Sequence, residues 1–100
     1  MPSPLYLGID VGTSATRVSL VGETGAQMAS ADYPTARDGA GHVEQDPVAW
    51  SGALAAALRR TGADLRGVTA VGLCGQTPTL VPVDAAGVPV RPALTWCPPA

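Results

Sequence analysis

The sequence contains no lysine, and its arginines are outnumbered by acidic residues, which gives a formal net charge of −2. A nucleic-acid-binding surface needs basic side chains gathered on one face or along one helix. The single adjacent basic pair, Arg59–Arg60, is better explained as positive charge near the C-terminus of a helix. We therefore predict that nucleic acid is not a partner of this chain.

Cysteine and histidine are also scarce. Cys74 and Cys97 form no Cys-x-x-Cys motif and His42 is the single histidine, so a clustered Cys/His zinc site is not expected and reduced thiols are favoured over a disulfide. No apolar run approaches the roughly 20 residues that cross a bilayer, and the first residues lack the basic and apolar regions of a secretory signal. We expect a cytoplasmic location and no membrane contact.

Phenylalanine is absent, so the core must be built from Val, Leu, Ala and Ile within at most one modest domain. An apolar run opens the chain, an alternating segment follows, and a Gly-rich turn leads into a third extended segment. This pattern predicts a three-stranded meander over residues 5–33. The segment 34–45 shows no periodicity and reads as a loop.

A helix is predicted over residues 47–61, with Asp46 as N-cap and Pro47 in the first turn. Trp50 lies on its apolar stripe and is expected in the core. The continuous apolar run that follows reads as a strand buried on both faces, and Asp84 most simply begins a turn between two later strands. The predicted strands cover 68–74, 79–84 and 88–95. The expected fold is α/β, with a mixed five-stranded sheet and one main helix. Because one helix cannot cover both faces of such a sheet, we expect an incomplete domain with exposed apolar surface.

The segment Gly8–Arg17 carries the strongest chemical signal. The first strand delivers Asp10 to its end, where a carboxylate can hold a hydrated Mg²⁺ near phosphates. Gly12 permits a turn that a Cβ would obstruct, and the amides and hydroxyls of Thr13 and Ser14 can then face phosphate oxygens. Arg17 can supply a fixed positive donor. The alternative is an ordinary hairpin with local hydrogen bonds; neither a Walker loop nor a Rossmann glycine motif is present.

Two further blocks accompany this segment. Gly-His-Val-Glu-Gln-Asp-Pro at 41–47, before a Trp-bearing helix, resembles the element that precedes the first helix in the FGGY family of carbohydrate kinases. The residues at 71–76, 80–84 and 87–96 look like that family's strand, sugar loop, hairpin and Trp block. The three blocks occur in the family's order, the resemblance covers residues 5–96, and xylulokinase-like members are the most similar in appearance.

The resemblance implies a ribonuclease H-like fold of the actin/hexokinase superfold and transfer of the ATP γ-phosphate to a sugar or polyol hydroxyl. ATP and Mg²⁺ would be the cofactors, and a sugar the other small-molecule partner. Carried over by position, Asp10 would serve the metal. The residues implied to bind phosphate are Gly12, Thr13, Ser14 and Arg17, and those implied to contact the sugar are Gln76, Thr77, Pro78 and Trp96.

The sequence departs from the family pattern in two places. Thr77-Pro78 stands where xylulokinases usually carry Met-His, and proline offers no side-chain donor or acceptor, so sugar recognition is expected to differ. After Trp96 the family has an acidic residue and an arginine, whereas this chain reads Cys-Pro-Pro-Ala. The family's general base lies well downstream, beyond Ala100, so we expect no catalytic residue within residues 1–100 and negligible turnover from them alone.

Several readings stay open. The chain is expected to be part of a longer kinase or to form a homo-oligomer; the alternative is a non-catalytic, truncated kinase-like protein that binds a partner through its exposed sheet face. Another ATPase of the same superfold is a third reading. Glu44 either orients the sugar loop or bonds to backbone amides, Trp96 either lines the site or is simply buried, and His42 and Cys74 are expected to have no catalytic role.

Overall fold

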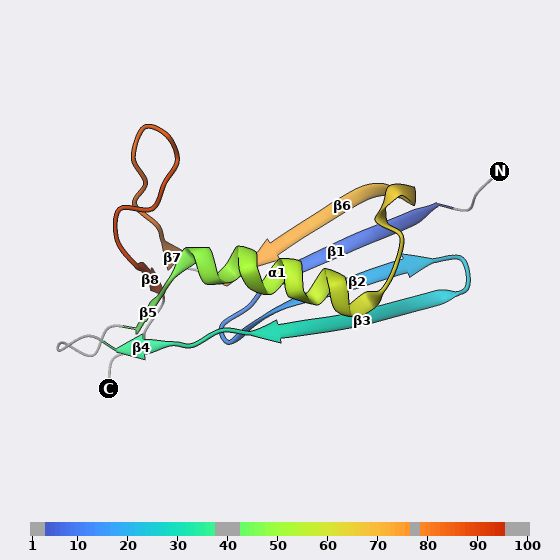
Figure 1. Ribbon diagram of the computed structural model, residues 1–100, viewed down its shortest axis with the longest axis horizontal. Coiled ribbons are helices and arrows are strands. Elements are labelled where there is room, and N and C mark those ends of the chain that lie inside the picture. The colour runs from blue at the N-terminus through green and yellow to red at the C-terminus, as the bar shows by residue number, and fades with distance from the viewer. Residues whose placement is uncertain (1–3, 38–42, 77–78, 96–100) are drawn as a thin grey trace.

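The computed structural model describes residues 4–37, 43–76 and 79–95. It contains one long helix and two small sheets that together extend over 55 × 33 × 20 Å. In Figure 1 the N-terminal end of β1 lies at one end of the molecule, and the second sheet lies at the other end.

The main sheet has the strand order β3-β2-β1-β6. β1 (Leu5–Val11), β2 (Ala15–Gly22) and β3 (Gly25–Asp32) form the predicted antiparallel meander, and β6 (Val68–Gly75) runs parallel to β1. The sheet is therefore mixed, as predicted, but it has four strands rather than five.

The remaining strands form a second, antiparallel sheet in the order β4-β5-β8-β7. β4 (Ala36–Arg37) and β5 (Val43–Gln45) come from the segment predicted as a loop. β7 (Thr79–Leu80) and β8 (Ala93–Thr95) are shorter than the predicted strands 79–84 and 88–95, and between them only Val83 and Pro89 form an isolated bridge. Prolines in this stretch lack the N–H group that a continuous ladder needs, which accounts for the short strands.

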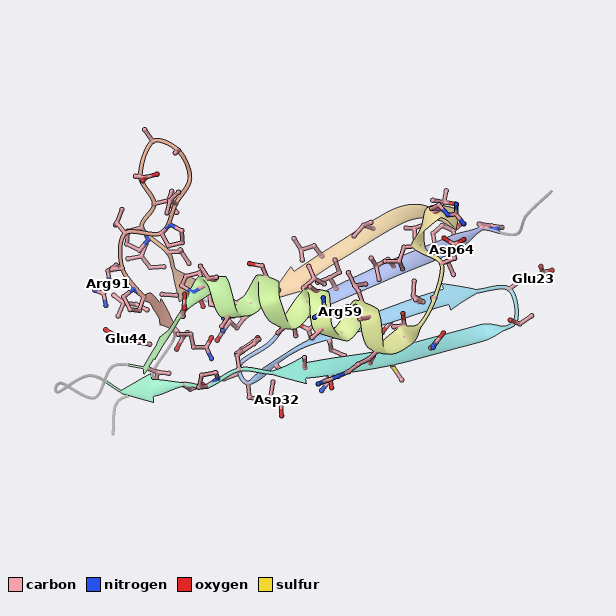
Figure 2. The ribbon with its side chains drawn as sticks, in the orientation of Figure 1. Glu23, Asp32, Glu44, Arg59, Asp64 and Arg91 are labelled. Atoms are coloured by element: carbon pink, nitrogen blue, oxygen red, sulfur yellow. The ribbon has the colours of Figure 1, made fainter. Side chains whose placement is uncertain are left out.

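Two predicted details of this second sheet can be compared with the structure. The Asp84 carboxylate accepts hydrogen bonds of 2.9 Å from the amides of Ala86 and Val88, so Asp84 does begin a turn. Glu44 instead forms an ion pair of 2.6 Å with Arg91, an arrangement that neither reading of Glu44 anticipated. Figure 2 shows these two side chains at the same end of the molecule.

The helix α1 (Pro47–Thr61) has the predicted ends. The Asp46 carboxylate accepts from the amide of Val48 at 3.0 Å, and Gly62 closes the helix in the left-handed conformation with φ of 64°. The helix packs on β3 and β2 through alanines, which permit close approach, while Trp50 is half-buried beside them. The buried core consists of Leu7, Val18, Leu20, Ala31, Tyr33, Ala53 and Ala57.

Strand β6 differs most from its prediction. We expected it to be buried on both faces, but it lies at the edge of the main sheet, and α1 packs mainly on β2 and β3. Val71 is 58% exposed and Leu73 is 74% exposed. The prediction of exposed apolar surface on the sheet is therefore confirmed, and two of the residues that form it lie on this strand. Within the described residues no helix is long and apolar enough to cross a membrane.

Candidate functional site

The turn between β1 and β2 is fastened to the protein by Tyr33. The buried Tyr33 side chain shares its single hydroxyl hydrogen between the carbonyl of Gly12 and, at 2.9 Å, that of Ala15. The Tyr33 amide donates to the Ser14 carbonyl at 3.0 Å, and the Gly12 amide donates to Ala15 at 2.9 Å. Three of the turn's carbonyl groups are thus held on its inner side.

The fourth carbonyl of the turn, that of Thr13, accepts a hydrogen bond from the side-chain amide of Gln45. Thr13 and Ser14 are both exposed, and within the described parts of the chain their own amides donate no hydrogen bond. Because the carbonyls of this turn are bonded within the protein while the amides of Thr13 and Ser14 are not bonded to any described residue, these exposed N–H groups can donate to an anion.

Gly12 is required by close packing rather than by an unusual φ. A Cβ built on Gly12 would lie 3.1 Å from the carbonyl oxygen of Ala15, inside the normal contact distance. The same oxygen accepts the Gly12 amide and the Tyr33 hydroxyl, so it has little freedom to move. The glycine keeps the turn narrow, as the sequence predicts.

Asp10 lies beside this turn on the face of the sheet away from the Leu7 side of the core. In the strand register it is opposite Arg17 on β2 and Cys74 on β6. All three line an open cavity of about 460 Å³ whose floor includes Gly8 and Gly72, where no side chain fills the space. No ion pair joins Asp10 and Arg17 in the described structure, so both charges are available to a ligand.

Two pKa shifts mark this region. A hydrogen bond to Asp10, with smaller effects from desolvation and the carboxylate charge, raises the pKa of the exposed Cys74 thiol. Burial raises the pKa of Tyr33 above its usual 10.0; Asp10 adds to this and the Thr16 hydroxyl opposes it. Both groups are therefore neutral near pH 7.

The residues at this cavity can be compared with the needs of Mg²⁺. Among the described residues no group of three or more His, Cys, Asp or Glu side chains could enclose a metal. Mg²⁺ does not require such a cage, because it usually keeps several waters and takes one or two carboxylates plus substrate phosphates. Asp10 beside a turn of N–H donors fits that kind of site.

The second candidate region lies on the other side of the same strand ends. Gln76 follows β6; its amide donates to the carbonyl of Val11 at 2.9 Å, and its side chain donates to Gln45 at 2.7 Å. It lines a cavity of about 450 Å³ together with Trp50 and Leu73. Of the other residues predicted to contact a sugar, Thr77, Pro78 and Trp96 lie outside the described residues, as do His42 and Cys97.

Sequence reasoning missed two residues that organise this site. Tyr33 was assigned only to the end of a strand, and Gln45 only to a motif without a role. A signal existed for Gln45, because it stands immediately before a helix cap in the block that resembles the kinase family. No local pattern pointed to Tyr33, since its partners are 18 and 21 residues away in the sequence.

Comparison with known proteins places this arrangement in a family. The structure is an α/β protein with a mixed sheet, whose first hairpin places N–H groups that are unbonded within the described residues near a carboxylate. The family model for the N-terminal domain of the FGGY family of carbohydrate kinases matches residues 5–99. The chain belongs to this family, and the actin/hexokinase-like fold predicted from the sequence is confirmed in its incomplete form.

Similar proteins agree on the class. The chain is 43% identical over 95 residues to the xylulose kinase of Streptomyces rubiginosus and 34% identical over 96 residues to that of Escherichia coli; these alignments cover 93% and 92% of this chain. A xyloylose kinase structure from Brucella ovis superposes with a TM-score of 0.81 at 30% identity, over 90% of this chain and 20% of that one. A gluconate kinase from Lactobacillus acidophilus, at 22% identity and a TM-score of 0.81, shares the fold. The chain spans about a fifth of the length of the curated relatives it matches.

Proposed function

We propose that this chain is the N-terminal part of an ATP-dependent sugar or polyol kinase, and that a ketopentose such as xylulose is the first substrate to test. The observation that carries the proposal is the turn from Gly12 to Ser14, whose carbonyls bond inward beside Asp10. Its support from outside the site is the family membership and the names of the most similar relatives.

In the proposed reaction, an oxygen of the sugar hydroxyl attacks the γ-phosphorus of ATP while the bond from that phosphorus to the bridging oxygen of ADP breaks. The amides of Thr13 and Ser14, with Gly12 allowing close approach, would hold phosphate oxygens, and Arg17 would neutralise charge on them. Asp10 would hold Mg²⁺, which supplies neutralisation of phosphate charge when bound.

The sugar would lie near Gln76, with Thr77, Pro78 and Trp96 completing the contacts. The base that takes the hydroxyl proton and the adenine pocket would belong to the four-fifths of the relatives' length that this chain does not span. For that reason residues 1–100 alone are expected to bind phosphate or sugar weakly and to show no turnover. Val71 and Leu73 on β6 would be covered by that further part of the protein.

The test is sugar-dependent ADP formation by the full-length polypeptide, with xylulose, other ketoses and polyols as acceptors. Asp10→Ala should lower kcat/KM by about 100-fold or more, because Mg²⁺ loses its carboxylate ligand and the phosphates lose the charge neutralisation that the metal supplies. Asp32→Ala is the matched control, since Asp32 is an exposed carboxylate at the end of β3 in the same sheet. Unchanged turnover in Asp10→Ala would remove Asp10 from the site, and ADP formation with no dependence on any acceptor would argue against a sugar kinase.

A second candidate is favoured by the exposed strand β6: a non-catalytic relative that binds a protein partner through Val71 and Leu73. Light scattering and a Mg-ATP titration of the 100-residue chain separate the two. Stable self-association without nucleotide binding would support this second candidate, and nucleotide binding by a monomer would support the kinase.

A further inference from the structure

Gln45 is a buried polar side chain at the meeting point of the two candidate regions. It is 3% exposed, and its amide group makes four contacts. Its Nε2 donates to the carbonyl of Thr13 and, at 3.0 Å, to the hydroxyl of Thr35. Its Oε1 accepts from the indole N–H of Trp50 at 3.0 Å and from the side-chain amide of Gln76 at 2.7 Å.

The chemistry of these partners fixes which way the amide points. An indole N–H can only donate, and a backbone carbonyl can only accept. Oε1 must therefore face Trp50, and Nε2 must face Thr13. Both hydrogens and both lone pairs of Gln45 are then used, so the side chain has one satisfied orientation and no spare capacity.

This orientation also determines the polarity of Gln76. Because Gln45 presents an oxygen to Gln76, Gln76 must donate from its Nε2, and its Oε1 is left to accept from another partner. The main chain of Gln76 is held as well, through its amide to Val11 and its carbonyl from the Thr79 hydroxyl at 3.2 Å. Gln76 thus offers a fixed acceptor at a cavity, which suits a hydroxyl donor.

We propose that Gln45 is a positioning residue that ties the turn at Thr13 to Gln76, the residue proposed to contact the sugar, holding the Thr13 carbonyl with its donor and the Gln76 side chain with its acceptor. The roles of the turn and of Gln76 rest on the proposed kinase function, whereas the coupling between them through Gln45 rests on the contacts above. A buried amide that only filled space could be replaced by an apolar side chain of similar volume at little cost to either region.

Two substitutions of Gln45 separate its contact with the turn from its contact with Gln76. Gln45→Glu, as a carboxylate, keeps acceptors for Trp50 and Gln76 but loses both donors. It should therefore lose the bond to the Thr13 carbonyl in the turn and keep the bond to Gln76. Gln45→Met keeps the volume and loses all four bonds, so it should release both. Thr35→Val is the matched control, because it removes one partner of Nε2 and leaves Thr13 and Gln76 bonded.

In the full-length enzyme we expect Gln45→Glu to raise KM for ATP by about tenfold, the effect of losing roughly 1.4 kcal/mol of positioning, with KM for the sugar changed less than about twofold. Gln45→Met should raise both KM values, and Thr35→Val neither. Equal changes in both KM values with Gln45→Glu, or no change with Gln45→Met, would overturn the proposal.

A second measurement does not depend on turnover. In the ¹⁵N-labelled 100-residue chain, Gln45→Glu should shift the Thr13 and Ser14 amide resonances and leave the Gln76 side-chain NH₂ pair near its wild-type position, whereas Gln45→Met should move both sets. If the wild-type enzyme transfers no phosphate to any sugar, the proposed function fails, and these shifts alone decide the role of Gln45. Movement of both sets by Gln45→Glu, or of neither by Gln45→Met, would contradict it.

Discussion

Removing the hydroxyl of Tyr33 is expected to destabilise the protein by loosening the turn between β1 and β2. In Tyr33→Phe the Ala15 carbonyl keeps the Gly12 amide as a partner, but the Gly12 carbonyl loses the one hydrogen bond that the described structure gives it. Leaving one partly buried acceptor unpaired costs about 1–2 kcal/mol. With a urea m-value of about 1–1.5 kcal/mol/M for a chain of this size, the unfolding midpoint should fall by roughly 1 M.

The pH dependence of this effect has a definite sign. The pKa of Tyr33 is raised in the folded protein above its unfolded value of 10.0, so folding favours the neutral phenol. That stabilisation is fully present below pH 10.0 and is lost as the pH rises through the folded pKa. The difference in unfolding free energy between wild type and Tyr33→Phe should therefore be constant from neutral to mildly alkaline pH and shrink above pH 10.0.

The assay is urea unfolding followed by circular dichroism at several pH values. Tyr6→Phe is the control, because it makes the same chemical change at a side chain that is 47% exposed. If Tyr33→Phe costs no more stability than Tyr6→Phe, or if the difference between wild type and Tyr33→Phe stays constant across pH 10.0, the reasoning about this turn is wrong.

Two other predictions concern the turn between β1 and β2 and the cavity that Asp10 lines. Gly12→Ala should destabilise the chain by about 1 kcal/mol, since its Cβ would meet the Ala15 carbonyl. Gly8→Ala, whose Cβ has nothing closer than 3.9 Å, should be neutral within about 0.5 kcal/mol in the same unfolding assay. Equal costs of the two substitutions would contradict the close-packing argument. Cys74 should react slowly with iodoacetamide at pH 8, because the hydrogen bond to Asp10 raises its thiol pKa, and Asp10→Asn should speed the reaction in a Cys97→Ser background; an unchanged rate would show that Asp10 does not act on Cys74.

The sequence predicted elements whose signals are local. The meander follows from alternating residues and a Gly-rich turn, and the helix ends follow from Asp46 and Gly62, whose capping bonds involve neighbours within three residues. The presence of exposed apolar surface was also predictable, because a single helix cannot cover both faces of a sheet, but its location on Val71 and Leu73 was not.

What the sequence did not reveal depends on contacts between distant segments. The pairing of β5 with β8 joins residues nearly 50 positions apart, so the segment before the helix could not be recognised as a strand from its own pattern. The apolar run of β6 predicted burial because composition cannot tell an edge strand from a central one. Tyr33 acts through backbone carbonyls, which carry no side-chain signal in a sequence. Gln45 bonds to groups in several separate segments, and only its place before the helix cap marked it.

The most direct test of the account is an NMR titration of the ¹⁵N-labelled chain with Mg-ATP. We predict saturable shifts of the Thr13 and Ser14 amide resonances, weakened by Asp10→Asn, while the amide resonance of Thr24 in the β2–β3 turn stays in place as an internal reference. Thr13 and Ser14 amides that move no more than Thr24, at nucleotide concentrations that shift other parts of the chain, would contradict it.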